Sequence, residues 1–284
     1  MRSLKIPASD GYELAAHVFG EAAAKGRAWV VIAPATGVPQ GFYRRFAQYL
    51  TDEGYGVVSF DYRGVGASAP ATLRGFDASF LDWAHQDLTS VVTWARERAD
   101  VAVVGHSFGG QAYGLLSPEL KLLGLCAFGT GNGWHGHMAP LERVKILAMW
   151  HLLAPALTRV YGYLPSQLVG LGEPLPMGVY RQWKRWCASE HHWFEDTSFD
   201  ARGHFDRVRS SVLAINASDD PWAGPRSART FMQHYRHANL ELRTVTPSEL
   251  GVSTIGHMGY FRAPVGQRLW PQVTAWLRRL EARA

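Results

Sequence analysis

Residues 101–114 read VAVVGHSFGGQAYG and place a serine between glycines directly after an apolar run. Residues 105–109 form the pattern G-x-S-x-G with Ser107 at its centre, between an expected buried strand and an expected helix. In that context the glycines permit close backbone approach, and the serine occupies a strained turn that holds its hydroxyl above a sheet. A glycine-softened turn without chemistry fits the same residues. If Ser107 is a nucleophile, other segments must supply a base, an acid and an oxyanion site.

Length and composition set limits on the class of protein. The 284 residues, 47% of them hydrophobic, can bury a sizeable core without the help of disulfide bonds or structural metal ions. Cys126 and Cys187 lie far apart, which argues against a disulfide framework or a four-ligand metal site and favours buried free thiols. The first twenty residues contain no secretory h-region, and no later run approaches the roughly 20 apolar residues of a membrane span. We therefore expect a cytoplasmic protein.

The net charge of +5 raises the question of an acidic partner. Lys and Arg are scattered, and their densest groups, RQWKRW (181–186) and WLRRLEAR (276–283), are typical of helix faces. A solvated surface is favoured over nucleic-acid binding, which needs a concentrated basic stripe or a known module. The charge could still help to attract anionic substrates.

Short apolar runs alternate with longer amphipathic stretches along the chain. The runs are nearly continuous rather than alternating, which is typical of parallel strands covered on both faces. An opening pair of segments around a Ser-Asp-Gly turn predicts an antiparallel hairpin at the sheet edge. The pattern predicts an α/β fold with a mostly parallel sheet and helices on both faces. The expected inner strands lie at 28–34, 55–61, 101–106, 122–129, 211–216 and 240–247, and the expected helices at 42–54, 80–99, 110–120 and 269–284.

The alternation breaks between residues 132 and 205, a stretch rich in Pro, Gly and aromatic residues. Because it lies between two expected strands, we interpret it as a helical cap inserted into a core domain of residues 1–131 and 206–284. Aromatic residues at helical spacing are more often core than ligand wall. A cap, however, presents one face to the site beneath it. The candidate substrate contacts are Trp134 in this stretch and Trp222 and Met258 in the core domain.

His257 is the candidate base among twelve histidines. It lies in STIGHMGYF (253–261), a glycine-rich loop after the last expected strand. Ligands of open α/β sheets bind at the carboxyl ends of the strands, and this loop leaves one of those ends. An ordinary loop histidine is the competing interpretation.

The candidate acid follows the expected strand 211–216, where the chain reads NASDDPWAGP. We choose Asp220 to orient His257, with Asp219 as an Asx-turn residue or a helix cap. A carboxylate of the inserted stretch, Glu195 or Asp196, is a weaker alternative. The order Ser, Asp, His is the one described for α/β-hydrolases.

These motifs together resemble the α/β-hydrolase superfamily, from about residue 10 to the end of the chain. The matching segments are GHSFGG at the elbow, DYRGVGAS (61–68), Asp220, and GHMGYF around the histidine. The closest likeness is to a bacterial branch of predicted serine hydrolases. The resemblance implies an eight-stranded sheet, a cap after the sixth strand, and an oxyanion site of backbone amides after the elbow serine and after the third strand.

The third-strand position departs from the commoner family pattern. Many members carry His-Gly there, whereas this chain reads VVIAPATGVPQGFY (30–43). Backbone amides need no particular side chain, so the site survives the change. Phe108 supplies the first N–H and either Thr36 or Ala35 the second; the Thr36 hydroxyl either contributes or only caps the loop.

The remaining motifs favour structure over chemistry. DYRGVGAS is interpreted as a structural turn, with Arg63 bonded to nearby carbonyls. The histidines of HGH (135–137) and EHH (190–192) lack metal-ligand spacing and are expected at the surface or lining the cap. No G-x-G-x-x-G follows the first parallel strand and no Walker lysine is present, so we expect no cofactor.

The sequence thus predicts a cofactor-independent serine hydrolase of a small carboxylic ester or thioester. An acyltransferase with the same three side chains is the first alternative. A hydrolase-like binding protein without turnover is the second. The natural substrate and the oligomeric state stay open.

Overall fold

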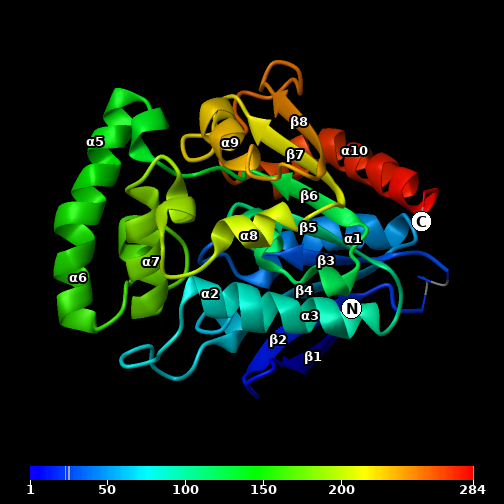
Figure 1. Ribbon diagram of the computed structural model, residues 1–284, viewed down its shortest axis with the longest axis horizontal. Coiled ribbons are helices and arrows are strands. Elements are labelled where there is room, and N and C mark those ends of the chain that lie inside the picture. Colours follow the sequence, from blue (N-terminus) through cyan, green and yellow to red (C-terminus); the bar gives the residue numbers. More distant parts are fainter. Residues whose placement is uncertain (23, 25, 284) are drawn as a thin grey trace.

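An eight-stranded sheet forms the centre of the protein in a computed structural model that describes residues 1–22, 24 and 26–283 (Figure 1). The strand order is β1-β2-β4-β3-β5-β6-β7-β8, which confirms the predicted eight-stranded sheet. The strands are β1 (Arg2–Pro7), β2 (Glu13–Phe19), β3 (Trp29–Ala33), β4 (Gly56–Phe60), β5 (Val101–His106), β6 (Gly124–Phe128), β7 (Ser211–Ala217) and β8 (Asn239–Val245).

The first two strands differ from the other six in direction. β1 pairs antiparallel with β2, and β2 antiparallel with β4, whereas all pairs from β4 through β8 are parallel. The hairpin therefore forms the antiparallel edge that the sequence predicts. All parallel strands end at one edge, so the loops after β3, β5, β7 and β8 come together there.

Both faces of the sheet are covered, and β5 shows why its sequence is continuously apolar. Val101 and Val103 pack into a cluster with residues of α3 (Thr89–Arg96). Ala102 and Val104, which point to the other face, pack with residues of α1 (Arg44–Asp52) and α10 (Ala263–Glu281). In Figure 1, α3 lies on one side of the sheet and α1 and α10 on the other.

Two helices differ from their predicted ranges by more than three residues. The expected helix 110–120 is short: α4 (Phe108–Ala112) starts at the elbow and gives way to two 3-10 turns, the second at Pro118–Leu120. Gly114 lies against the Phe205 ring, where any side chain would clash. α10 begins at Ala263, six residues before the expected start, because a proline suits the first helical turn.

The stretch between β6 and β7 contains four α-helices, of which the first two are joined by a π-helical turn at Met149–Leu153 and the others by less regular segments. They are α5 (Pro140–Ala148), α6 (Ala154–Tyr161), α7 (Met177–Cys187) and α8 (Ala201–Asp206). α5, α6 and α7 stand together beside the sheet (Figure 1). α8 instead packs on the core, where Phe205 is fully buried. We call residues 132–205 the insert.

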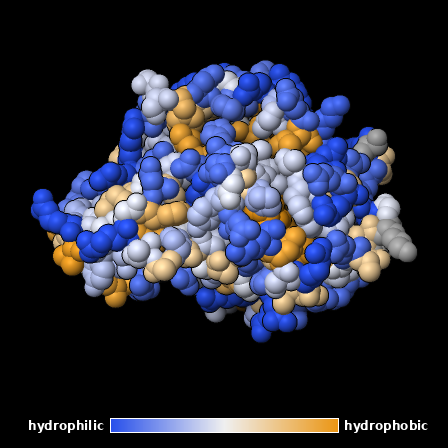
Figure 2. All heavy atoms as spheres, turned by 90° about the horizontal axis from the view of Figure 1, so that it is seen from below, coloured by the Kyte–Doolittle hydropathy of each residue, from blue (hydrophilic) through white to orange (hydrophobic). Residues whose placement is uncertain are grey.

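The insert exposes more large apolar side chains than the sheet and its helices do. Figure 2 shows orange apolar atoms beside blue polar ones at the end of the molecule formed by this region. No helix in the described part of the chain has the length and apolar character needed to cross a membrane. The exposed apolar side chains of the insert are Leu141, Val144, Leu152, Leu153, Val160, Tyr161 and Leu168.

Candidate active site

Ser107 sits in a strained turn between β5 and α4. Its φ is 52°, a left-handed value that few non-glycine residues adopt. The Ser107 N–H donates to the Phe128 carbonyl at 2.8 Å, and the Thr130 hydroxyl donates to the Ser107 carbonyl at 3.1 Å. These bonds to the loop after β6 hold the turn, and Ser107 is half-buried between two fully buried neighbours.

The glycines of the motif are required by close packing. A Cβ on Gly109 would overlap the Ala33 carbonyl oxygen at the end of β3. A Cβ on Gly105 would overlap the Gly110 backbone. The elbow therefore packs against the end of β3 only because Gly109 lacks a side chain, and α4 lies close to the end of β5 only because Gly105 lacks one.

His257 and Asp220 meet at the carboxyl edge of the sheet. His257 Nδ1 lies 2.9 Å from Asp220 Oδ2 and 3.0 Å from Oδ1. Asp220 follows β7 and His257 follows β8. Ser107 and His257 both line one cavity of about 210 Å³. The structure thus brings the three sequence-predicted side chains to one place.

Asp220 is buried and fully bonded. Its Oδ1 accepts from the N–H groups of Trp222 and Ala223 at 2.9 Å each, and its Oδ2 accepts from the Tyr260 hydroxyl at 3.1 Å. Burial by itself would raise the pKa of Asp220, but the charge of His257 and these hydrogen bonds hold it below its ordinary value. Asp220 is therefore a carboxylate, able to orient the imidazole. Sequence reasoning did not assign Tyr260, although it lies in the quoted GHMGYF.

Asp219 acts across to another loop rather than within its own turn. Its carboxylate accepts from the Thr254 hydroxyl at 2.8 Å and from the N–H groups of Ile255 and Gly256 at 2.9 and 3.1 Å. Burial opposes this ionisation, yet the three donors lower the pKa of Asp219. The expectation that Asp219 forms an Asx turn or caps a helix was wrong, because its partners lie in another loop. Asp219 holds the loop that carries His257.

A buried chain of hydrogen bonds connects the loop after β3 to the His257 loop. The Ala35 N–H donates to the Tyr43 hydroxyl at 2.9 Å, and that hydroxyl lies 2.9 Å from His106 Nδ1. His106 Nε2 lies 2.9 Å from the His257 carbonyl oxygen. Only an N–H can bond that carbonyl, so Nε2 carries the proton, and Nδ1 accepts from Tyr43. Burial, with the nearby imidazole of His257, lowers the pKa of His106 to about 3 and keeps it neutral.

The same chain decides between the two candidate oxyanion amides after β3. The Ala35 N–H is already bonded to Tyr43, so Ala35 is removed as a donor. Within the described part of the chain, the N–H groups of Thr36 and Phe108 have no acceptor. Thr36 lines the cavity beside Ser107, and the Phe108 ring is anchored below by stacking on Phe80 at 4.2 Å.

Of the three candidate substrate contacts, two reach the cavity and one does not. Trp222 and Met258 line it. Trp134 does not, because its ring packs edge-on against His137 with centroids 4.9 Å apart. Sequence reasoning missed the insert residues Leu171 and Trp183, which do line the cavity.

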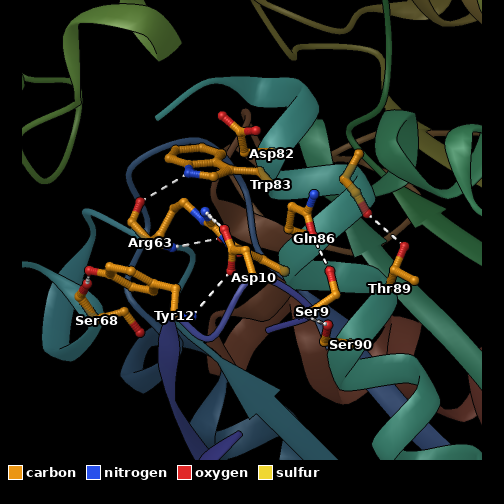
Figure 3. Close-up of polar contacts among 12 residues, drawn as sticks. Ser9, Asp10, Tyr12, Arg63, Ser68, Asp82, Trp83, Gln86, Thr89 and Ser90 are labelled. Carbon is orange, nitrogen blue, oxygen red and sulfur yellow. Dashed lines mark hydrogen bonds and ion pairs between the residues drawn. The ribbon is translucent and has the colours of Figure 1, made fainter. Parts of the chain in front are cut away.

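The DYRGVGAS segment is a structural turn, as expected, but Arg63 binds carboxylates rather than carbonyls. Its guanidinium pairs with Asp10 at 2.5 Å and with buried Asp87 at 2.7 Å, and the Trp83 indole N–H donates to the Arg63 carbonyl at 3.0 Å (Figure 3). These contacts tie the β1–β2 turn to the helical segment that covers the sheet. Asp61 of the same segment accepts from the backbone and side chain of Gln40, just after the Thr36 loop.

The titratable groups that the sequence singled out in the insert lie in structural surroundings. His137 bonds Glu190 at 3.0 Å, and His192 is buried among aromatic rings. Asp196 binds Arg185 and Trp186, so it does not serve as the acid. No group of three or more His, Cys, Asp or Glu side chains in the described residues could hold a metal ion.

Comparison with known proteins shows which sequences and folds the chain resembles. The sequence model of the serine aminopeptidase S33 family matches residues 24–162. An esterase from Pyrococcus furiosus superposes with a TM-score of 0.65 at 14% identity, covering 98% of this chain and 90% of the esterase. Est1E from Butyrivibrio proteoclasticus, solved with ferulic acid bound, gives 0.65 at 16% identity, covering 98% and 99%. An esterase from Exiguobacterium antarcticum gives 0.64 at 17% identity, covering 98% and 100%. No curated protein matches the chain by sequence.

The chain has the α/β-hydrolase fold, and the family model that matches residues 24–162 supports the resemblance found in its motifs. The narrower likeness to a bacterial branch stays a prediction.

Proposed function

We propose that the protein is a serine hydrolase that cleaves a carboxylic ester or thioester through Ser107, His257 and Asp220. The observation that carries this proposal is the pairing of His257 Nδ1 with a buried carboxylate, beside a cavity that the strained Ser107 shares. His257 Nδ1 keeps its proton and donates a hydrogen bond to Asp220. Nε2 is then unprotonated, which is the tautomer a general base needs.

The proposed reaction has two halves. Ser107 Oγ attacks the substrate carbonyl while His257 Nε2 takes the hydroxyl proton and then gives it to the leaving oxygen or sulfur. Water, deprotonated by the same imidazole, attacks the resulting acyl-serine and releases the acid, and the proton returns to Ser107. The N–H groups of Phe108 and Thr36 would bind the oxyanion in both halves, since neither has an acceptor among the described residues.

Residues 132–205 are proposed to act as a cap over this site. Gly170, Leu171, Trp183 and Cys187 of the insert line the cavity, and the Glu173 N–H donates to the Gly37 carbonyl at 2.8 Å beside Thr36. The esterase neighbours support ester cleavage as the reaction, and the apolar insert side chains favour an acyl or aryl group on the substrate.

An acyltransferase is the second candidate. The aromatic lining formed by Trp183, stacked on Trp222 at 5.6 Å, favours it because a dry cavity disfavours water as the second nucleophile. Partition of the acyl-enzyme between water and added alcohols, thiols or amines separates the two reactions.

The test is covalent labelling of folded protein with a fluorophosphonate, followed by a panel of esters and thioesters with short to long acyl chains. We expect one label on Ser107 and activity that is lost in Ser107→Ala. Absence of labelling would favour a binding protein without turnover. Activity that persists in Ser107→Ala would defeat the mechanism.

A further inference from the structure

A second hollow lies on the opposite side of α7 from the Ser107 cavity. This groove, of about 910 Å³, is bounded by α7 on one side and by the segment from α5 to α6 on the other. Cys187, near the end of α7, borders both the groove and the Ser107 cavity. Trp183, which lines the cavity, packs edge-on against Trp150, which lines the groove, with centroids 5.1 Å apart. Cys187 is thus the residue at which the linings of the two hollows meet.

The groove is lined by cations without matching carboxylates. Arg159, Arg181, Lys184 and Arg185 border it, and no Asp or Glu is among the described residues of its lining. Arg185 pairs with Asp196 at 2.7 Å. The other three form no ion pair with any residue that the structure describes. They leave an uncompensated positive charge facing one hollow.

The spacing of these residues along α7 places their like charges on one face of the helix. Arg181, Lys184 and Arg185 stand at i, i+3 and i+4 of α7, so their side chains share a face, where like charges repel. The three cations of RQWKRW, which was interpreted from the sequence as a solvated helix face, border this open concave surface. A guanidinium offers a fork of donors that matches phosphate oxygens, and an ammonium adds a point charge. The aromatic rings of Trp150 and Tyr180 give the groove an apolar floor beside these cations.

On this basis, and resting on the proposed function, we propose that the groove binds a phosphate-bearing leaving group of the substrate. The acyl group lies in the Ser107 cavity, and the leaving group extends past Cys187 toward Arg159, Arg181 and Lys184. The acyl thioester of a phosphorylated thiol and the acyl ester of a phosphorylated alcohol share this chemistry. After acyl transfer to Ser107, the phosphorylated thiol or alcohol departs with the proton from His257.

The test compares two matched substrate pairs. Hexanoyl-coenzyme A is paired with the neutral thioester hexanoyl-N-acetylcysteamine, and 1-hexanoylglycerol 3-phosphate with 1-hexanoylglycerol. We expect kcat/KM to favour the phosphate-bearing member of at least one pair. In Arg181→Gln/Lys184→Gln that ratio should fall about 10-fold, through KM, because two partly exposed charge contacts are lost. The pair that shows the preference identifies the leaving group as thiol or alcohol.

A charge-matched control is Arg278→Gln/Arg279→Gln on α10, across the molecule from the insert (Figure 1). It removes the same charge and should keep the wild-type ratio. Raised salt should lower the wild-type ratio and have little effect on that of the α7 variant. Equal kcat/KM within both pairs, or a ratio that survives in the α7 variant, would overturn the proposal.

Direct binding separates failure of the groove from failure of the catalytic proposal. Coenzyme A is titrated calorimetrically into Ser107→Ala and into Ser107→Ala/Arg181→Gln/Lys184→Gln, and glycerol 3-phosphate is titrated in the same way. Binding that is lost with the two cations supports the groove even if wild-type Ser107 takes no fluorophosphonate label. No binding of either compound to Ser107→Ala, with wild-type Ser107 labelled, overturns the groove and leaves the hydrolase proposal standing.

Discussion

His106 Nε2 donates to the carbonyl oxygen of His257 across 2.9 Å, so the residue before the elbow serine supports the backbone of the proposed base. The other ring nitrogen of His106 accepts from Tyr43, which in turn accepts from the Ala35 N–H. The loops after β3 and β8 are thus connected through one neutral imidazole at the end of β5. We therefore expect the position of His257 relative to Ser107 to depend on this connection as well as on Asp220.

Removing the Tyr43 hydroxyl should separate these loops. Tyr43→Phe leaves the buried Ala35 N–H and His106 Nδ1 unpaired, which costs roughly 1 to 3 kcal/mol of unfolding free energy. We expect kcat to fall about 10-fold with little change in KM, since Tyr43 is a positioning residue outside the cavity. Urea denaturation and ester kinetics measure both effects. If the unfolding free energy falls as expected while kcat is unchanged, the role of Tyr43 is purely structural.

Asp220→Asn should lower kcat by roughly 10³ to 10⁴, because the amide no longer fixes the imidazole tautomer that leaves Nε2 as the base. Asp219→Asn provides the matched comparison one residue away. It weakens the three bonds to the loop at 254–256 without touching His257, and we expect a loss of about 10-fold. Ester kinetics and the rate of fluorophosphonate labelling measure both. Equal losses in the two variants would contradict the assignment of Asp220 as the acid.

The sequence predicted the sheet, and it predicted that Ser107, Asp220 and His257 come together, because each of these expectations depends on local signals. Continuously apolar runs mark strands covered on both faces, and glycines around Ser107 mark a close approach that the structure explains at Ala33. His257 and Asp220 follow expected strands, and parallel strands end at one edge of the sheet. The strand pattern therefore determines where these residues lie.

Other parts of the site depend on pairings between distant segments, and no local pattern reports them. The choice of Thr36 over Ala35 rests on the hydroxyl of Tyr43, which sits at the start of the next helix. Asp219 looked like a turn residue because the partners that define its position are 35 to 37 residues away. Trp134 was a reasonable aromatic candidate in the insert. The segments between the helices of the insert have no regular pattern in the sequence, and they place Trp183 of α7 at the cavity instead.

Gly109→Ala should destabilise the protein strongly, since its Cβ would overlap the Ala33 carbonyl and force β3 and α4 apart. Overpacking of this kind costs about 1 to 3 kcal/mol or more. Gly41→Ala is the matched control, because a Cβ there meets no described atom within 4 Å and its backbone needs no positive φ. Urea denaturation of the two variants measures the difference. Equal midpoints would contradict the close packing of the elbow against β3.

Stability should fall as the pH is lowered from 7 toward 4, because His106 and His192 are buried as neutral imidazoles. Burial lowers the pKa of each to about 3, from an ordinary value of 6.5 in the unfolded chain. Below pH 6.5 the unfolded state takes up these protons and the folded state does not. The contribution of the two histidines to the unfolding free energy is therefore fully present only above pH 6.5. Each histidine then removes about 1.4 kcal/mol of unfolding free energy per pH unit until the folded pKa is reached.

His192 is the residue on which to measure this effect, since it lies outside the hydrogen-bond chain of the site. Its Nδ1 has no partner among the described residues, and its φ of 52° is a conformation that asparagine also tolerates. Asparagine does not titrate, so the stability of His192→Asn should depend less on pH than that of the wild type. At pH 7 we expect the variant to be the less stable of the two. Between pH 6 and 4.5 we expect its unfolding free energy to fall by about 1.4 kcal/mol less per pH unit than that of the wild type. Urea denaturation at stepped pH gives both slopes. Parallel slopes would mean that His192 is protonated in the folded protein, against its burial among the rings of Trp186, Trp193 and Phe231.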